Sequence, residues 1–421
     1  MSTNNMDTES AKDKSAESAR HYLSDIARQA ARNAAATDFP SSIISSISET
    51  PCFLVGEAPL RRNLELIKSI KKRTGAKVLL ALKAFAMHDV FPIIAEYLDG
   101  VCASGPIEAK LGKETFGKEV HTFGPAYSEH DIQDLLKYSD TIIFNSIFQW
   151  KKYRSTIAKS GRKIEIGLRL NPKYSEIETS LYNPASPDAG LGILPEELKG
   201  EDLAGIDGLH FHVLCENSSD ALVRVLEHFE KFYGEYLPMV KWVNFGGGHH
   251  IARVDYDLDL LVETINAFKK KHNVQVHLEP GEGIALNTGV LVSTVLDIVH
   301  ENTEGKTVAI LDTSAEAHMP DVLAMSYSPD IMGAGSPGEK KYAYRLRGLT
   351  CLAGDIISDY TFDEPLKRGD KLVLLDMAIY TMVKTTTFNG VRLPSIAFLD
   401  LKNQVKIVKR FGYEAYKDRL S

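Results

Sequence analysis

The chain has 421 residues, which is more than one ordinary hydrophobic core holds and enough for two domains. The apolar share of 44% and charged share of 25% are typical of globular proteins, and the net charge of −7 gives no reason to expect nucleic acid or an anionic membrane as a partner. The four cysteines lie far apart and lack metal-ligand spacing, so we expect no bound metal, no disulfide framework and a reducing, cytoplasmic compartment.

The first 45 residues are expected to form a disordered tail. Residues 1–18 are polar and lack the apolar segment of a secretory signal. Residues 19–36 could form a weak arginine-bearing helix, but the acidic residues of this region argue against a transit peptide. The folded part is expected to begin near Thr50, and no apolar run beyond it approaches the roughly 18 residues that a membrane helix needs.

From there the sequence alternates short β-like runs with segments of helical periodicity. The eight runs are residues 77–83, 100–104, 120–124, 141–145, 163–170, 205–213, 241–247 and 274–280. Such alternation is typical of parallel strands joined by helical crossovers. Eight units predict an α/β fold, a closed (β/α)8 barrel over residues 57–287. An open doubly wound sheet is the alternative, which is disfavoured because no GxGxxG motif follows the first strand.

The pattern changes after about residue 287. The runs VLVSTVLDIVH, TVAILD, YAYRLRGLTCLAG, KLVLLDM, SIAFLD and VKIVKRF read as strands with little helical periodicity. Residues 326–342 carry proline and glycine and read as a long loop. Residues 288–421, together with 46–56, are therefore predicted to form a second, β-rich domain.

Barrel enzymes carry their chemistry at the carboxyl ends of the strands. Six of the predicted strands end near residues that can bind or react, namely Lys83, Ser104, Arg169, His212, the triplet Gly246, Gly247 and Gly248, and Glu279. Three consecutive glycines weaken a fold unless the backbone must approach something closely. Backbone N–H groups there can hold a phosphate, although a tight turn before a helix is an equal alternative for the triplet alone.

Lys83 follows an apolar run, where burial would lower the pKa of its amine and make it a nucleophile toward an aldehyde. A lone lysine here would more often point out of the barrel mouth. A strand-end lysine, phosphate-binding glycines and the acid Glu279 together indicate a cofactor with an aldehyde, a phosphate and a basic ring nitrogen, which is pyridoxal 5'-phosphate.

Glu279 is then expected beside the ring nitrogen, keeping it protonated so that the ring accepts electrons from the substrate's α-carbon. This favours loss of CO2. His212 is expected to stack on the ring, whereas His210 can be an ordinary core histidine. His249 and His250 are not interpreted as a metal pair.

At this point the sequence resembles the alanine racemase-like, fold type III enzymes that use this cofactor, and among them the decarboxylases of basic amino acids. The resemblance covers roughly residues 50–415. It is carried by ALKA, FHV, NFGGG and EPG in the predicted barrel, and by LTCLAGD and DMAIYTMVKTTTFNG in the β-rich domain.

One departure is informative about the subfamily. Ornithine, lysine and diaminopimelate decarboxylases usually have EPGR, whereas this chain has EPGEG, with Glu282 in the place of the arginine. With TPCFLV, HFHVLCEN and LDTSAEAHMPDVL, this is similar to the carboxynorspermidine/carboxyspermidine decarboxylase family. The resemblance implies a carboxylated polyamine as substrate, and a cationic substrate suits the added acid.

The resemblance also implies roles in the β-rich domain. Cys351 would return a proton to the α-carbon, although a free cysteine is usually a small buried residue. Asp355 and Asp312 would bind substrate amines, and Tyr380 would bind the cofactor phosphate. Arg169 would support the cofactor's surroundings or form a structural ion pair.

The family further implies a homodimer in which the β-rich domain of one copy faces the barrel of the other. Three alternatives stay open: another decarboxylase of the same fold, an amino acid racemase, and a non-catalytic carrier or regulatory homologue. Glu282 disfavours the first and Glu279 the second. The β-rich domain and the retained Lys83 disfavour the third.

Overall fold

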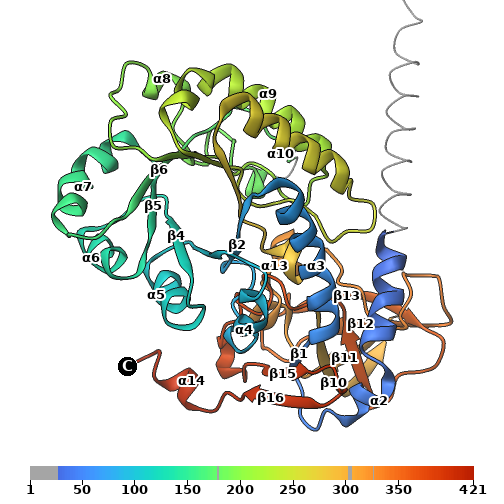
Figure 1. The fold of residues 1–421 in the computed structure, drawn as a ribbon. Helices are drawn as coiled ribbons and strands as arrows, with labels where there is room; N and C mark the ends of the chain where they lie inside the picture. Colours follow the sequence, from blue (N-terminus) through green and yellow to red (C-terminus); the bar gives the residue numbers. More distant parts are fainter. Residues whose placement is uncertain (1–26, 178–179, 302–305, 326) are drawn as a thin grey trace, which may run out of the picture. The chain divides into compact units, whose positions relative to one another are not determined.

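The computed structural model describes residues 27–177, 180–301, 306–325 and 327–421, and Figure 1 shows the chain as a ribbon. It divides into two compact units. The barrel unit comprises Pro59–Ala252 and Tyr256–Leu286, and the sheet unit comprises Met1–Ala58, Arg253–Asp255 and Asn287–Ser421. Among the described residues, no helix is both long and apolar enough to cross a membrane.

The barrel unit contains eight parallel strands that close on themselves, β2 pairing with β9 as well as with β3. They are β2 (Lys77–Ala81), β3 (Gly100–Ala103), β4 (Glu119–Phe123), β5 (Thr141–Phe144), β6 (Glu165–Arg169), β7 (Gly208–His210), β8 (Trp242–Asn244) and β9 (Gln275–Leu278). Each strand overlaps one of the eight predicted runs, so the predicted (β/α)8 barrel is confirmed and the open sheet is excluded.

Helices connect most of these strands and surround the barrel (Figure 1). They are α3 (Glu57–Thr74), η1 (His88–Val90), α4 (Phe91–Ala95), α5 (Pro106–Thr115), α6 (Glu129–Tyr138), α7 (Ile147–Lys159), η2 (Ser180–Tyr182), α8 (Pro195–Leu198), α9 (Ser219–Tyr233), η3 (Gly234–Met239), α10 (Leu258–His272) and α11 (Glu282–Ala285). Helix α9 illustrates the pattern, because Leu222, Val225 and Phe229 recur at helical spacing and are all buried.

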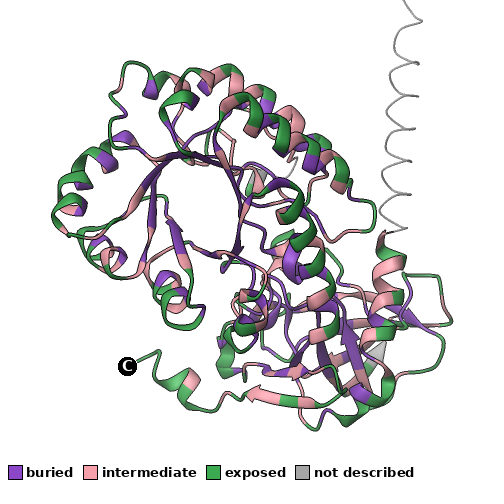
Figure 2. Cartoon of the chain, viewed as in Figure 1, coloured by how far each residue is buried: buried purple, intermediate pink, exposed green. Residues whose placement is uncertain are grey.

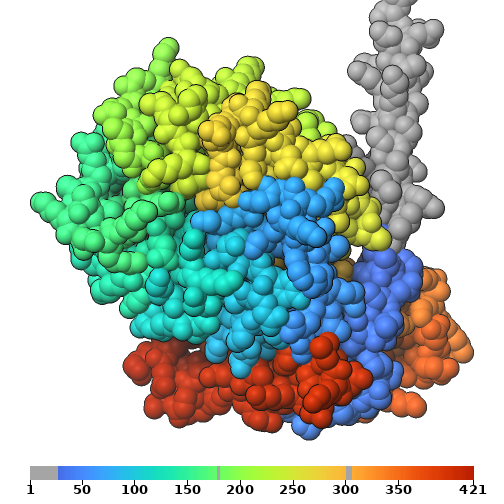
Figure 3. All heavy atoms as spheres, viewed as in Figure 1, coloured from blue at the N-terminus to red at the C-terminus, as the bar shows by residue number. Residues whose placement is uncertain are grey.

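The barrel interior is packed, and Figure 2 shows its strands as mostly buried. The space-filling view shows side chains where the ribbon leaves an opening (Figure 3). The indole of Trp242 packs directly against two glycines, Gly167 of β6 and Gly208 of β7. A Cβ on Gly208 would lie 2.0 Å from the indole, and a Cβ on Gly167 would lie 2.6 Å from it, so neither position can carry a side chain. The mouth of the barrel therefore rests on a filled core rather than on a pore.

The sheet unit is built on a mixed eight-stranded sheet in the order β13-β12-β11-β10-β1-β15-β16, with β14 paired to β10. Its strands are β1 (Cys52–Gly56), β10 (Gly289–Glu301), β11 (Thr307–Leu311), β12 (Tyr342–Arg347), β13 (Ile356–Phe362), β14 (Lys371–Leu374), β15 (Ser395–Leu399) and β16 (Val405–Lys409). Its helices after β11 are α12 (Ala315–His318), α13 (Pro320–Met325), η4 (Phe388–Gly390) and α14 (Glu414–Lys417). The predicted β-rich character is confirmed, although β13 was not among the predicted strands.

The prediction of a disordered tail is wrong for residues 27–45; residues 1–26 lie outside the described part of the chain. Residues 27–38 form a helix that is followed by α2 (Ser41–Ser46). Phe39 is fully buried in a cluster with residues of β1, β10, β14 and β15. Arg32 is paired with Asp330 at 2.7 Å. The segment is ordered because its few apolar residues complete the core of the sheet unit.

Replacing Phe39 with Ala should therefore destabilise the protein. The side chain is completely inaccessible, and removing a buried phenyl ring costs about 3–5 kcal/mol. Urea unfolding should show an early transition, while Ala36→Ser, an exposed change in the same segment, should unfold like the unchanged protein. Equal midpoints for the two variants would contradict the integration of this segment into the sheet unit.

Candidate active site

Lys83, His212 and the glycine turn meet after the carboxyl ends of their barrel strands. Lys83 lies in the turn after β2, and its Nζ is 3.3 Å from Nε2 of His212, which follows β7. Nδ1 of His212 accepts a hydrogen bond of 3.1 Å from the N–H of Gly247, after β8. Gly246 in turn accepts a bond of 2.8 Å from the N–H of Glu279, after β9. Five of the predicted site residues thus form one continuous set of contacts.

The amine of Lys83 has the properties that the sequence predicted. Although part of the side chain reaches solvent, protein atoms surround the amine, and this desolvation lowers its pKa. The positive charge of Arg169 adds to the shift, and the negative charge of Glu279 opposes it. Lys83 is therefore nucleophilic at a lower pH than an exposed lysine is.

The hydrogen bonds around His212 also favour an uncharged amine on Lys83. Burial, with Lys83 and Arg169 next, lowers the pKa of His212 well below its usual value, so the ring is neutral. A backbone N–H can only donate, so Nδ1 accepts from Gly247 and Nε2 carries the ring proton. The contact between Nε2 and Lys83 is then a hydrogen bond only if the lysine is an uncharged acceptor.

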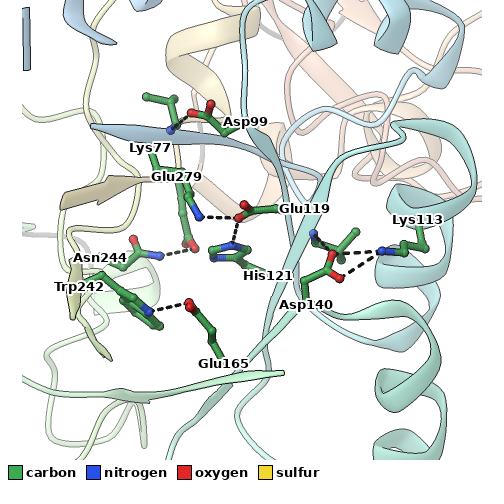
Figure 4. A network of polar contacts seen from close by, with 12 residues as sticks. Lys77, Asp99, Lys113, Glu119, His121, Asp140, Glu165, Trp242, Asn244 and Glu279 are labelled. Carbon is green, nitrogen blue, oxygen red and sulfur yellow. Dashed lines mark hydrogen bonds and ion pairs between the residues drawn. The ribbon is translucent and has the colours of Figure 1, made fainter. Parts of the chain in front are cut away.

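Glu279 lies deep in the barrel, with 9% of its surface exposed. Its Oε1 accepts a hydrogen bond of 2.6 Å from Nδ2 of Asn244, at the end of β8, as Figure 4 shows. Its Oε2 is 3.7 Å from Nε2 of His210. Burial, followed by the charges of Arg169 and Lys83, lowers the pKa of His210 well below its usual value, so this is a contact with a neutral ring.

The glycine triplet is required by close backbone approaches. Gly246 and Gly248 have φ of +69° and +85°, which disfavours other residues. A Cβ at Gly247 would lie 2.4 Å from the carbonyl oxygen of Glu279, and one at Gly248 would lie 2.0 Å from that of Leu214. Within the described chain, the N–H of Gly248 has no hydrogen-bond partner, which leaves a donor for an anion at this turn.

Arg169 is buried near this site. It makes a hydrogen bond to the backbone of His212 rather than a short-range ion pair. Its Nη2 donates a hydrogen bond of 3.0 Å to the carbonyl of His212, and its guanidinium lies 4.4 Å from the centre of the Phe123 ring. Burial lowers its pKa to about 10, against the opposing charge of Glu279. It contributes positive charge and fixes the end of β7.

Ser104 and Glu282 have partners within the barrel unit. Ser104 follows β3, is exposed, and its N–H donates to Oε2 of Glu108 at 2.6 Å. Glu282 begins α11, and its Oε1 is 3.2 Å from Nε2 of His250. His249 is buried, which lowers its pKa to about 4, and its Nδ1 is 3.5 Å from the Tyr256 hydroxyl. The described residues contain no cluster of ligands suited to a metal.

Cys351 and Tyr380 belong to the sheet unit. Cys351 is exposed in the loop between β12 and β13, and its N–H donates to Oδ1 of Asn389 at 2.9 Å. Tyr380 has φ of +51°, and Nζ of Lys384 lies 5.4 Å from the centre of its ring. The thiol is accessible for proton transfer, as its predicted role requires.

The structure does not support the predicted substrate contacts of Asp355 and Asp312. Asp355 is fully buried, and its carboxylate accepts hydrogen bonds from Ser314, Ala315, Glu316 and Thr350. A carboxylate that is saturated by its own unit has no site left for a substrate amine. We therefore infer that Asp355 has a structural role and holds the loop that carries Cys351 in place.

Asp312 is occupied in a similar way. Its Oδ1 accepts from the hydroxyl of Ser293 at 2.6 Å and from the N–H of Thr294 at 2.9 Å. Its Oδ2 accepts from the hydroxyl of Thr50 at 2.5 Å. These bonds connect β10, β11 and the segment before β1, which is a structural role.

Two residues of the site were missed by the sequence interpretation. Asn244 is fully buried beside Glu279, and Cys102, on β3, lies near both Glu279 and Lys83. Burial raises the pKa of Cys102 well above its usual value, followed by the charge of Glu279, so this thiol is neutral. A polar residue that ends an apolar strand just before the glycines was the available signal for Asn244.

Comparisons with known proteins show the family of this chain. The family model described as pyridoxal-dependent decarboxylase, C-terminal sheet domain, matches residues 21–378. A carboxynorspermidine/carboxyspermidine decarboxylase of Campylobacter jejuni is 44% identical over 88% of this chain and 98% of its own length. A carboxyaminopropylagmatine decarboxylase of Synechocystis is 42% identical, covering 88% of this chain and 95% of its own.

A solved structure adds to this. The crystal structure of carboxynorspermidine decarboxylase complexed with norspermidine, from Campylobacter jejuni, has a TM-score of 0.82 and 44% identity, covering 88% of this chain and all of that one. The family and the relatives each extend over most of both units. The chain therefore belongs to the pyridoxal-dependent decarboxylases, in the group that contains the carboxynorspermidine/carboxyspermidine decarboxylases.

Proposed function

We propose that this chain uses pyridoxal 5'-phosphate to decarboxylate carboxynorspermidine or carboxyspermidine, releasing norspermidine or spermidine. The observation that carries the proposal is the contact series from Lys83 through His212 and the glycine turn to Glu279. The names of the relatives with 44% and 42% identity support a carboxylated polyamine as the substrate class.

The residues present fit the cofactor. The Lys83 amine, with its lowered pKa, suits the aldehyde, and the N–H of Gly248 in the glycine turn suits the phosphate. The Glu279 carboxylate suits a protonated ring nitrogen. When bound, the cofactor supplies an electron-withdrawing ring that accepts the electron pair left on the α-carbon as CO2 departs.

The chain's own groups would orient the reactants and move protons. Lys83 would hold the cofactor, with Nε2 of His212 as its hydrogen-bond partner. The hydroxyl of Tyr380 would donate a hydrogen bond to the phosphate. Cys351, which is exposed, would deliver its thiol proton to the former α-carbon and recover a proton from solvent.

The acid at position 282 supports a cationic substrate. Glu282 lies beside His250 with 12% of its side chain exposed, so the carboxylate is partly screened from water. Such an acid favours an ammonium or secondary amine over a second carboxylate group. Diaminopimelate, which carries two carboxylates, is therefore the weaker candidate, and its decarboxylases are distant relatives of this chain.

The test is a substrate panel. Purified protein loaded with pyridoxal phosphate is incubated separately with carboxynorspermidine, carboxyspermidine, carboxyaminopropylagmatine and diaminopimelate, and the released amine is identified by mass spectrometry. We expect norspermidine or spermidine at the highest kcat/KM. Preferential release of lysine from diaminopimelate, or no amine from any compound, would overturn the proposal.

We further propose a cytoplasmic homodimer with shared sites. The free cysteines support a reducing location. Leu349, Leu352 and Phe388 are large apolar residues that are exposed close to Cys351 in the sequence or beside its partner Asn389. Exposed apolar side chains around a reactive loop suit a face that a second copy covers.

Mixing two inactive variants tests the sharing. Lys83→Ala and Cys351→Ala should each be inactive as pure proteins. After joint refolding, half of the dimers are mixed and each has one intact site, so about a quarter of the original activity should return. Recovery that stays at the level of the separate variants would contradict shared sites.

A further inference from the structure

Asn244 is a buried polar residue of the barrel that has no role in the proposed reaction so far. It ends β8, is fully buried, and lies beside Glu279 (Figure 4). It also contacts Gly246, the first residue of the glycine turn. A buried amide must satisfy both its donor and its acceptor atoms. The partners of those atoms show what this side chain does.

The orientation of the Asn244 amide is fixed by its two partners. Its Oδ1 accepts a hydrogen bond of 2.8 Å from the N–H of Gly246, and its Nδ2 donates one of 2.6 Å to Oε1 of Glu279. A flipped amide would set its NH2 against the backbone N–H and its oxygen against the carboxylate. Both contacts would then be repulsive, so only one orientation is stable.

A third hydrogen bond closes a ring of contacts. The N–H of Glu279 donates to the carbonyl of Gly246 at 2.8 Å. Gly246 is thus held by the Asn244 side chain at its N–H and by the Glu279 backbone at its carbonyl. Asn244 therefore positions both Glu279, the acid proposed to face the ring nitrogen, and the glycine turn proposed to face the phosphate.

The donor also affects the charge of Glu279. A hydrogen bond donated to a carboxylate stabilises its ionised form, and the effect is large where water is excluded. Neutral His210, 3.7 Å from Oε2, is too distant for a strong hydrogen bond. Among the described side chains, the neutral thiol of Cys102 also hydrogen-bonds to this carboxylate. A thiol is a weak donor, so the amide of Asn244, at 2.6 Å, is the strong neutral donor to Glu279.

We propose that Asn244 is a positioning residue that keeps Glu279 ionised and aligned with the cofactor's ring nitrogen while fixing the glycine turn that receives the phosphate. The inference rests on the cofactor site of the proposed function and extends it. An ionised Glu279 favours the proton on the ring nitrogen; a Glu279 without its donor favours the proton on its own oxygen. Loss of Asn244 should therefore shift the proton from the ring to the carboxyl group.

The test replaces Asn244 with Leu, which keeps the volume and removes both polar atoms. Nitrogen NMR of the holoenzyme, reconstituted with pyridoxal phosphate labelled at the ring nitrogen, measures the protonation of that atom. We expect the signal to move toward the unprotonated ring and kcat to fall about 10- to 100-fold, as for other residues that orient a reactive ligand. A purely structural role would change stability without moving the signal.

Asn171→Leu is the matched control. Asn171 is also a buried amide at a strand end of the barrel, donating to the Leu191 carbonyl and accepting from the N–H of Lys173. Its loss should leave the ring-nitrogen signal unchanged. If Asn244→Leu yields no folded protein, Asn244→Ser is measured by the same criterion.

A ring nitrogen as protonated in the Asn244 variant as in the unchanged holoenzyme would overturn the inference. Failure of the proposed function would look different. If the cofactor site is wrong, the unchanged protein itself binds no cofactor and gives no ring signal; if only the substrate is wrong, the substrate panel shows it and the ring signal is unaffected.

Discussion

Replacing Lys83 with Ala should abolish the visible absorbance of the bound cofactor and lower kcat/KM by at least about 10³-fold, since proton transfer alone by a positioned group contributes 10²–10⁴-fold. In the barrel the amine is desolvated and in contact with neutral His212, so it is prepared for attack on an aldehyde. The measurement is an absorbance spectrum together with initial rates on the best polyamine substrate.

Lys77→Ala is the matched control for this variant. Lys77 begins the same strand, β2, but its amine pairs with Glu119 at 2.6 Å, as Figure 4 shows. This variant should keep the absorbance and most of the activity. An Lys83→Ala protein with an undiminished visible band would contradict the role of Lys83.

The pH dependence of cofactor loading tests the lowered pKa of Lys83 independently. Only the neutral amine attacks an aldehyde, so the rate of reconstitution should rise with pH. Because desolvation lowers the pKa of Lys83, the plateau should be reached below the pKa of an ordinary lysine, about 10.4. Stopped-flow absorbance after mixing the apoprotein with pyridoxal phosphate measures this profile.

Replacing Glu279 with Gln should lower kcat by about 10²- to 10³-fold, the usual cost of removing a preorganised charge from a desolvated site. The cofactor should still be attached to Lys83, because the contact between Lys83 and His212 does not depend on Glu279. The effect should therefore be in the decarboxylation step, which single-turnover measurement of CO2 release can separate from substrate binding.

Glu119→Gln provides the comparison for Glu279. Glu119 is another acid on a barrel strand, where the hydrogen bond with His121, followed by Lys77, lowers its pKa to about 2. Among the described residues, the hydrogen bonds of its side chain go to Lys77 and His121 and not to the Lys83 group, so its loss should change kcat only a few-fold. Equal rate losses in the two variants would mean that the Glu279 effect is not specific.

Much of the barrel could be predicted because its rules are local. Each predicted run overlaps a barrel strand, since buried parallel strands read as short apolar segments between helical ones. Lys83, His212, Gly246 and Glu279 could be predicted for a second reason. A closed parallel barrel collects all carboxyl strand ends at one rim, so residues distant in the sequence must meet there.

What could not be predicted depends on which partner a polar or apolar group finds. Asp355 looks available in LTCLAGD, but the fold surrounds it with donors from α12 and Thr350. Phe39 lies in a polar, alanine-rich context, and only the sheet unit supplies the apolar surface that buries it. Tertiary partners of this kind override the local pattern, and one sequence does not contain their identity.

The attachment of the cofactor to a single lysine tests the central claim most directly. The holoenzyme is reduced with borohydride, which makes the lysine–cofactor bond permanent, digested, and analysed by tandem mass spectrometry. The account predicts one phosphopyridoxyl group, on the peptide that carries Lys83. A modification on any other lysine, or none at all in protein that is active, would contradict it.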